Sequence, residues 1–153
     1  MPVIIILACI LIEHVSRYLF RDFITLSYNP GVALDILRGN PGLALIFSGI
    51  ACVIIIFACI FLNMNKFTRL GLAIMTGGAL SNLLERIFLG YVIDWIPMIF
   101  IDYNCNLADV EISLGALIAV WPNMKQLLPR FTQRSNIFFY SSTSISCSLR
   151  KLR

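Results

Sequence analysis

Residues 90–109, GYVIDWIPMIFIDYNCNLAD, combine three aspartates, Asp94, Asp102 and Asp109, with no Lys or Arg. The sequence on either side is strongly apolar, and no cation within the segment neutralises these carboxyls. Two carboxyls held close together in a poorly hydrated place do not both ionise easily, so one keeps its proton while the other acts as a base. Such a pair can activate a water molecule and donate a proton to a leaving amine, and it needs neither a metal nor a cofactor. The segment therefore predicts a paired-carboxylate site.

Further polar residues cluster just before this segment and at its end. Asn82, Glu85 and Arg86 stand at positions i, i+3 and i+4, which places them on one face of a helix. Asn106 and Asp109 are spaced by three where the next apolar stretch begins. We expect the two groups to converge, with the Asn and Arg side chains orienting carboxylates or binding a substrate carbonyl.

The composition indicates where such a site would lie. The chain has 153 residues, of which 59% are hydrophobic and only 13% charged, and its mean hydropathy is +0.86. Soluble domains are about half apolar and about a quarter charged, so we expect an integral membrane protein. The net charge of +4 is then better explained by membrane topology than by a nucleic-acid partner. The five cysteines show neither zinc-like spacing nor a CxxC motif.

Apolar stretches divide the chain into candidate spans. The clearest is 42–62, GLALIFSGIACVIIIFACIFL, which is uncharged and long enough to cross a bilayer. We expect an all-α membrane domain over 1–128 with four transmembrane helices, at about 3–20, 42–62, 70–89 and 110–124. The first stretch lacks the basic region and small-residue cleavage site of a signal peptide, so we expect a retained helix. Small residues in the third stretch predict a close helix-packing interface: Gly71, Ala73, Gly77, Gly78, Ala79 and Ser81.

The distribution of cations orients the spans. Lys66 and Arg69 lie between the second and third spans, and the serine-rich tail over 129–153 is basic. Because an excess of Lys and Arg marks the cytoplasmic side, we expect both termini and this tail in the cytoplasm. The segments 21–41 and 90–109, with the aspartates, then lie at the outer membrane face.

Other interpretations of the acidic residues stay open at this point. Aspartates in outer loops are often solvated, and Glu85 with Arg86 can form a simple charge pair at a helix end. A small proton- or ion-conducting protein is a further alternative, since acids at membrane depth also form relays. Its relay would use Glu13, Glu85, Asp94 and Asp109. Against it, the middle of the second span holds no ionisable group and no transporter-like repeat is visible.

Three stretches resemble the lipoprotein signal peptidase (signal peptidase II) family. They are GGALSNLLERIFLGYVIDW at 77–95, NLAD at 106–109 and TLSYNPGVAL at 25–34. The resemblance extends over roughly residues 10–125 and includes the order and orientation of four spans. It implies an aspartic endopeptidase of the bacterial inner membrane. Such an enzyme removes the signal peptide from prolipoproteins just before the cysteine that carries a diacylglyceryl group.

The resemblance also implies roles for particular residues. Asp94 and Asp109 match the two catalytic aspartates, whereas Asp102 matches no catalytic position and is expected to be a solvated loop acid. The family's substrate-contacting polar residues match Asn29, Asn82, Arg86 and Asn106. Glu85 would give structural support, and the segment 21–41 would form a small extracytoplasmic β-cradle, with 23–26 as its strand-forming stretch before a Pro-Gly turn. We expect a monomer in contact with membrane lipid.

The chain departs from the family pattern at several positions. Glu85 stands where the family has Asp, Ser81 where Gly is usual, and Cys105 where Phe is usual. Glu13-His14 and Ser16 differ from the family's first helix, and Glu111 adds a charge just after Asp109. We expect these changes to affect substrate preference and rate more than reaction type, and we expect His14 to be hydrogen-bonded structure. A weakened paralogue that binds lipid-modified peptides without cutting them is a further alternative, although both aspartates are retained.

Overall fold

The computed structural model describes residues 2–23, 25–31, 37, 39–98, 103–122 and 124. The chain divides into two compact units, Met1–Ala119 and Val120–Arg153. Every residue proposed for the site belongs to the first unit. Asp102, expected as a solvated loop acid, and the tail over 129–153 lie outside the described residues.

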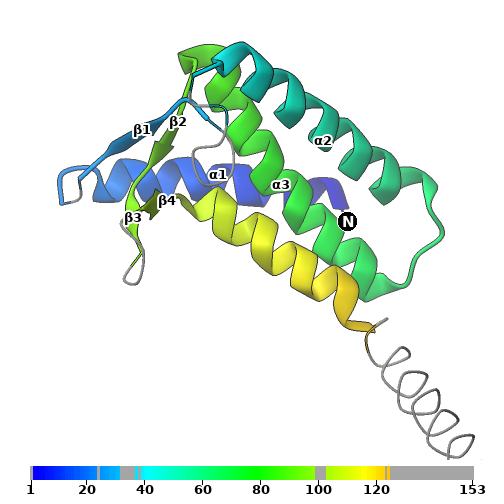
Figure 1. Cartoon of the computed structure of the whole chain (residues 1–153). Helices are drawn as coiled ribbons and strands as arrows, with labels where there is room; N and C mark the ends of the chain where they lie inside the picture. Colours follow the sequence, from blue (N-terminus) through cyan, green and yellow to red (C-terminus); the bar gives the residue numbers. More distant parts are fainter. Residues whose placement is uncertain are drawn as a thin grey trace, which may run out of the picture. The chain divides into compact units, whose positions relative to one another are not determined.

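Helices make up most of the described chain (Figure 1). They are α1 (Pro2–Phe20), α2 (Pro41–Phe61), α3 (Lys66–Leu89) and a further helix over 107–122. Within the described residues, α1, α2 and α3 are long and apolar enough to cross a membrane. They correspond to the spans expected at about 3–20, 42–62 and 70–89. The span expected at 110–124 stays a prediction.

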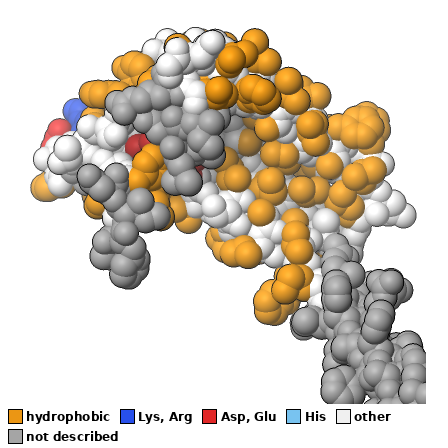
Figure 2. Space-filling model, viewed as in Figure 1, with side chains coloured by type: hydrophobic (Ala, Val, Ile, Leu, Met, Phe, Trp, Pro, Cys, Tyr) orange, Lys and Arg blue, Asp and Glu red, His pale blue; other side chains and the backbone are white. Residues whose placement is uncertain are grey.

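Apolar side chains, in orange, gather over much of the face that Figure 2 shows. Leu7 and Leu11 on α1, and Val53 and Phe57 on α2, are each more than half exposed. Monomeric soluble proteins rarely expose contiguous apolar patches larger than a few hundred Å². This surface therefore suits the hydrocarbon of a bilayer.

Local sequence sets the ends of α2 and α3. The Asn40 side chain accepts a hydrogen bond from the Leu43 N–H, and the Asn65 side chain accepts one from the Thr68 N–H. Each asparagine thereby satisfies a backbone donor that the first helical turn leaves unpaired. Gly90 ends α3 in the left-handed region, at φ 85°, and its N–H donates to the Arg86 carbonyl. That termination turns the chain directly into the aspartate segment.

Helix α3 lies between its neighbours and packs against both α1 and α2. A Cβ at Gly77 would meet Cys9 of α1, and one at Gly78 would meet the Ala108 carbonyl of the 107–122 helix. The backbones therefore approach closely at these glycines. The close interface predicted for the third stretch is confirmed there, and it fixes the depth of the 107–122 helix against α3.

Two small antiparallel sheets adjoin the helices. Strand β1 (Ser27–Asn29) pairs with β2 (Val92–Asp94), so that Ser27 lies opposite Asp94. Strand β3 (Ile96–Pro97) pairs with β4 (Asn104–Cys105). The expected strand at 23–26 is wrong for Phe23, Thr25 and Leu26, because the pairing partner, more than β-propensity, sets where a strand forms. The β-cradle over 21–41 stays a prediction, although β1 brings that segment against Asp94.

Candidate active site

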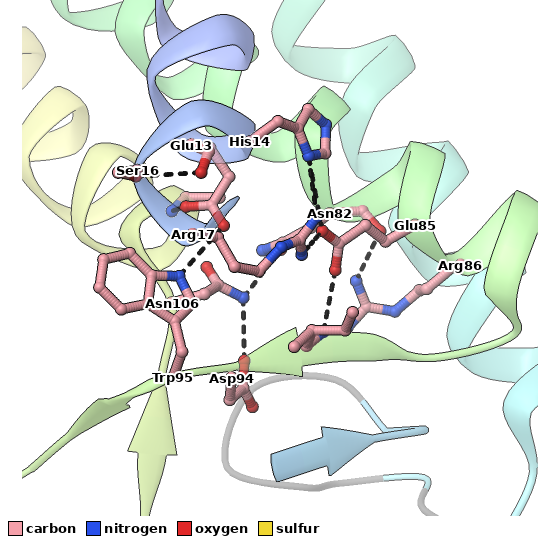
Figure 3. A network of polar contacts seen from close by, with 12 residues as sticks. Glu13, His14, Ser16, Arg17, Asn82, Glu85, Arg86, Asp94, Trp95 and Asn106 are labelled. Carbon is pink, nitrogen blue, oxygen red and sulfur yellow. Dashed lines mark hydrogen bonds and ion pairs between the residues drawn. The ribbon is translucent and has the colours of Figure 1, made fainter. Parts of the chain in front are cut away.

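Two asparagine amides join Asp94, at the end of β2, to Asp109, on the 107–122 helix. Asn106 Nδ2 donates to Asp94 Oδ1 at 2.9 Å and to Asn82 Oδ1 at 3.0 Å. Asn82 Nδ2 in turn donates to Asp109 Oδ1 at 2.9 Å. Figure 3 shows the hydrogen bond from Asn106 to Asp94. The predicted convergence of the Asn82 group with the Asn106 group is therefore confirmed.

The sequence NLAD positions Asp109 through a reciprocal cap. The Asp109 N–H donates to Asn106 Oδ1 at 2.8 Å, and the Asn106 N–H donates to Asp109 Oδ2 at 3.4 Å. This is the capping-box arrangement, in which the residue before a helix and its third residue satisfy each other's backbone donors. The carboxyl of Asp109 is thus fixed by the same contacts that start the helix.

Asp94 is almost fully buried, with 1% of its surface exposed. Burial raises the pKa of Asp94 from 3.8 to about 6; the nearby charge of Asp109 also raises it, whereas hydrogen bonds from Asn29 and Asn106 and the charge of Arg86 oppose the rise. Asn29 Nδ2 donates to Asp94 Oδ2 at 3.0 Å and to the Tyr103 hydroxyl at 2.9 Å. Asp94 can therefore gain and lose a proton near neutral pH.

Arg86 reaches the site from α3 with one donor unused. Its Nη1 donates to the Asn82 carbonyl at 3.1 Å and its Nη2 to the Gly31 carbonyl at 2.7 Å. Its Nε is buried and has no hydrogen-bond partner among the described residues. A guanidinium held by two carbonyl oxygens with a free Nε–H can donate to a ligand carbonyl.

Glu85 is held by α1 and not by its neighbour Arg86. Its carboxylate forms an ion pair with Arg17 and accepts a hydrogen bond from the Ile93 N–H at 2.8 Å. The interpretation of Glu85 with Arg86 as a helix-end charge pair is therefore wrong, because the carboxylate turns toward α1. His14 Nδ1 lies 3.0 Å from Arg17 Nη2, so His14 is hydrogen-bonded within this group as expected (Figure 3).

Glu13, which is 1% exposed, extends the support to the far side of the site. It accepts hydrogen bonds from the Ala108 N–H at 3.0 Å and from Trp95 Nε1 at 3.3 Å. One carboxylate of α1 thereby holds both the residue before Asp109 and the residue after Asp94. The residue patterns did not predict this bracing role, although an ionisable residue in an apolar helix was a signal for it.

One cavity of about 620 Å³ contains both aspartates in its wall. Asn29, Asn82, Arg86 and Tyr103 join them, whereas Asn106 is not among its lining residues. Tyr103 was missed by the sequence reasoning, although it lies within the aspartate segment. The remaining wall is mainly apolar and comes from α2, α3, the 107–122 helix and the β segments: Phe47, Ser48, Ala51, Ala79, Val92, Met98, Cys105, Val110, Ile112 and Ser113.

Three further positions that depart from the family pattern differ in whether they line the cavity. Cys105 lines the cavity, and burial, with the charges of Asp109 and Asp94, raises the pKa of its thiol. Ser81 and Glu111 are buried outside the cavity lining, and each has a side-chain oxygen with no partner among the described residues. The described residues include no cluster of three or more His, Cys, Asp or Glu suited to a metal ion.

The apolar helices and the buried aspartate–asparagine site define a membrane-embedded protein with groups suited to acid–base chemistry. Residues 4–125 match the profile of the peptidase family described as signal peptidase (SPase) II. The chain therefore belongs to the signal peptidase II family.

Individual relatives agree with this assignment. The chain is 32% identical to the lipoprotein signal peptidase of Moorella thermoacetica over 138 residues, which cover 79% of this chain and 91% of that one. It is 36% identical to the lipoprotein signal peptidase of Serratia marcescens over 114 residues, covering 71% and 66%. A bacterial membrane enzyme solved by the in meso method at 2.3 Å shares the fold, with a TM-score of 0.69 at 22% identity, covering 82% of this chain and 88% of that one.

Proposed function

We propose that this chain is an aspartic endopeptidase that removes the signal peptide from bacterial prolipoproteins before the lipid-modified cysteine. The observation that carries the proposal is the placement of Asp94 and Asp109 in one cavity, joined through the Asn106 and Asn82 amides. Neutral amide donors stabilise a carboxylate without fixing its charge as a cation would. The pair can therefore hold one proton between two carboxyls.

The reaction then follows from one shared proton. The ionised carboxyl takes a proton from water, whose oxygen attacks the carbonyl carbon of the scissile peptide bond. The protonated carboxyl donates to the carbonyl oxygen and stabilises the tetrahedral intermediate. As the C–N bond breaks, a proton passes to the leaving amine, and the pair again holds a single proton.

Substrate contact is assigned first to Arg86. Arg86 lines the cavity, and its guanidinium donates to a carbonyl of the bound peptide. The aspartates accept hydrogen bonds from the side-chain amides of Asn29, Asn82 and Asn106. Their main role is therefore to orient the two carboxyls, and Asn29 and Asn82 also reach the cavity where a substrate would touch them.

The substrate and location complete the proposal. The lipoprotein signal peptidases named above support a diacylglyceryl-modified prolipoprotein as substrate. The distribution of Lys and Arg supports the bacterial inner membrane, with both termini cytoplasmic and the site near the outer face. The proposal further has a monomer that takes its substrate from the surrounding lipid.

The test is cleavage of a diacylglyceryl-modified precursor by the purified full-length chain in detergent. Wild type should cut the precursor before its lipid-modified cysteine. Asp94→Asn and Asp109→Asn should each lose about 10²- to 10⁴-fold in activity, the range of general acid–base catalysis. Asp22→Asn is the matched control, because Asp22 is exposed and, within the described residues, forms an ion pair with Arg21 alone. Full activity in either site variant would remove the mechanism.

The ion-conducting alternative predicts a different result. Glu13 and Glu85 hold Trp95, Ala108, Arg17 and Ile93 and do not line the cavity, which weighs against a continuous acidic relay. Proton flux in liposomes without peptide cleavage would support the conductor and contradict the peptidase. Binding of the lipid-modified precursor without cleavage would instead support the weakened paralogue.

A further inference from the structure

Two serine hydroxyls lie in the cavity wall in addition to the groups proposed for catalysis. Ser113 comes from the 107–122 helix and Ser48 from α2. Ser113 Oγ donates to the Asp109 carbonyl at 2.8 Å, and Ser48 Oγ donates to the Ala44 carbonyl at 2.8 Å. A hydroxyl has one proton and two acceptor lone pairs. With its proton given to its own helix, each serine offers the cavity an acceptor only.

These acceptors stand among apolar groups. Phe47 and Ala51 flank Ser48 on α2, and Val110 lines the cavity from the same helix as Ser113. Ser113 is itself exposed, so its lone pairs are accessible to a molecule in the cavity. In apolar surroundings, a peptide N–H without a partner carries a substantial desolvation cost. The wall therefore favours a ligand that brings N–H donors to these positions.

A peptide cut at membrane depth brings such donors. This step rests on the proposed function, in which a membrane-spanning signal peptide reaches the aspartates. A helix shields its carbonyl carbons and uses their oxygens in internal hydrogen bonds, so the substrate must be unwound around the cut. Backbone groups freed in this way need partners, because lipid supplies none.

The spacing along the helix locates the donor. Ser113 follows Asp109 by one helical turn, about 6 Å along the axis at 1.5 Å per residue. An extended chain advances about 3.3 Å per residue, so this distance corresponds to about two residues of substrate. The 107–122 helix leads away from the outer face in the proposed orientation, which is also the direction of the signal peptide.

We propose that Ser113 Oγ accepts a hydrogen bond from a substrate backbone N–H about two residues before the cut, on the signal-peptide side. Ser113 is then a specificity residue that recognises an unwound backbone, whatever side chains the signal peptide carries. Ser48 supplies a second acceptor from the α2 wall. Together with the Arg86 guanidinium, the cavity offers both kinds of partner that an unwound peptide needs.

The experiment pairs a protein change with a single-atom change in the substrate. Four synthetic diacylglyceryl peptides are compared: one all-amide, and three in which one of the three amides before the scissile bond is an ester, which removes its N–H. Wild type and Ser113→Ala are assayed on each. We expect Ser113→Ala to lower kcat/KM about fivefold to tenfold on the all-amide peptide, the size of one hydrogen bond. Wild type should cut one of the three ester peptides more slowly than the all-amide peptide. Ser113→Ala should cut that ester peptide at the same rate as wild type does.

Two control variants separate recognition from folding. Thr76→Val removes a hydroxyl that also bonds the carbonyl four residues earlier, at 2.7 Å to Leu72, but that does not line the cavity; its kcat/KM should stay at the wild-type value. Ser113→Thr keeps the acceptor and should restore most of the rate.

The possible outcomes separate this inference from the proposed function. An equal loss on all four peptides, or no loss on any, overturns the role of Ser113 while cleavage by wild type leaves the peptidase standing. No cleavage of any peptide by wild type overturns the proposed function, and this inference with it.

Discussion

Two pairs of acidic residues, Glu13 with Glu85 and Asp94 with Asp109, are held in different ways around the proposed site. Glu13 and Glu85 accept from backbone N–H groups, the Trp95 ring N–H and the Arg17 cation, and they do not line the cavity. Asp94 and Asp109 accept side-chain hydrogen bonds from neutral asparagine amides and do line it. The contacts of the first pair join α1 and α3 to the segments that carry Asp94 and Asp109, so this pair braces the fold. The second pair faces the cavity and is the one proposed for proton transfer.

The largest expected effect separates the two pairs by activity. Asp94→Asn and Asp109→Asn should lose about 10²- to 10⁴-fold in precursor cleavage while keeping a cooperative thermal unfolding transition in detergent. Glu85→Asp, which keeps a carboxylate beside Arg17, should retain most of its activity. If Glu85→Asp were as inactive as Asp94→Asn, the division into bracing and reacting pairs would fail.

The next largest effect separates the two pairs of acidic residues by their contribution to the stability of the folded protein. Glu85→Ala removes the acceptor for Arg17 and for the Ile93 N–H, and breaking a buried ion pair costs about 3–5 kcal/mol. Glu13→Ala leaves the Ala108 N–H without its acceptor, at a cost of about 1–3 kcal/mol. The measurement is the midpoint of thermal unfolding in one detergent at one pH. Midpoints equal to that of Asp22→Asn would contradict the bracing role.

The smallest effect is the pH dependence of stability. Because the pKa of Asp94 is raised from 3.8 to about 6, folding favours its protonated form. That contribution is fully present below about pH 4 and is lost as pH rises through about 6. Asp94→Asn has no such proton. As the pH rises from 4 to 7, its unfolding midpoint should therefore rise relative to that of wild type. Parallel midpoints for the two proteins across this range would show that Asp94 carries no raised pKa.

Part of this architecture could be predicted from local sequence. Long apolar runs predicted α1, α2 and α3, and the spacing of Asn82 and of NLAD predicted which side chains would converge. These signals are local, because helical periodicity and capping depend on residues three or four apart.

The remaining contacts join residues that are distant in sequence. Glu13 meets Ala108, and Arg17 meets Glu85, through the packing of α1 against α3 and the site. No spacing rule links positions so far apart. The sequence prediction placed a strand at 23–26 instead of Ser27–Asn29 for the same reason, because the pairing partner of that strand, β2, lies far along the chain at 92–94.

The bond from Glu13 to the Ala108 N–H has a consequence for biosynthesis. Helix α1, which precedes α2 and α3 in the chain, supplies the acceptor, and the 107–122 helix supplies both the donor and Asp109. The proposed reactive centre is thus assembled only after translation has passed residue 109 and the 107–122 helix has docked. A nascent chain that ends between residues 94 and 109 holds Asp94 without its counterpart, so on the proposed mechanism it has no means of cutting neighbouring membrane peptides.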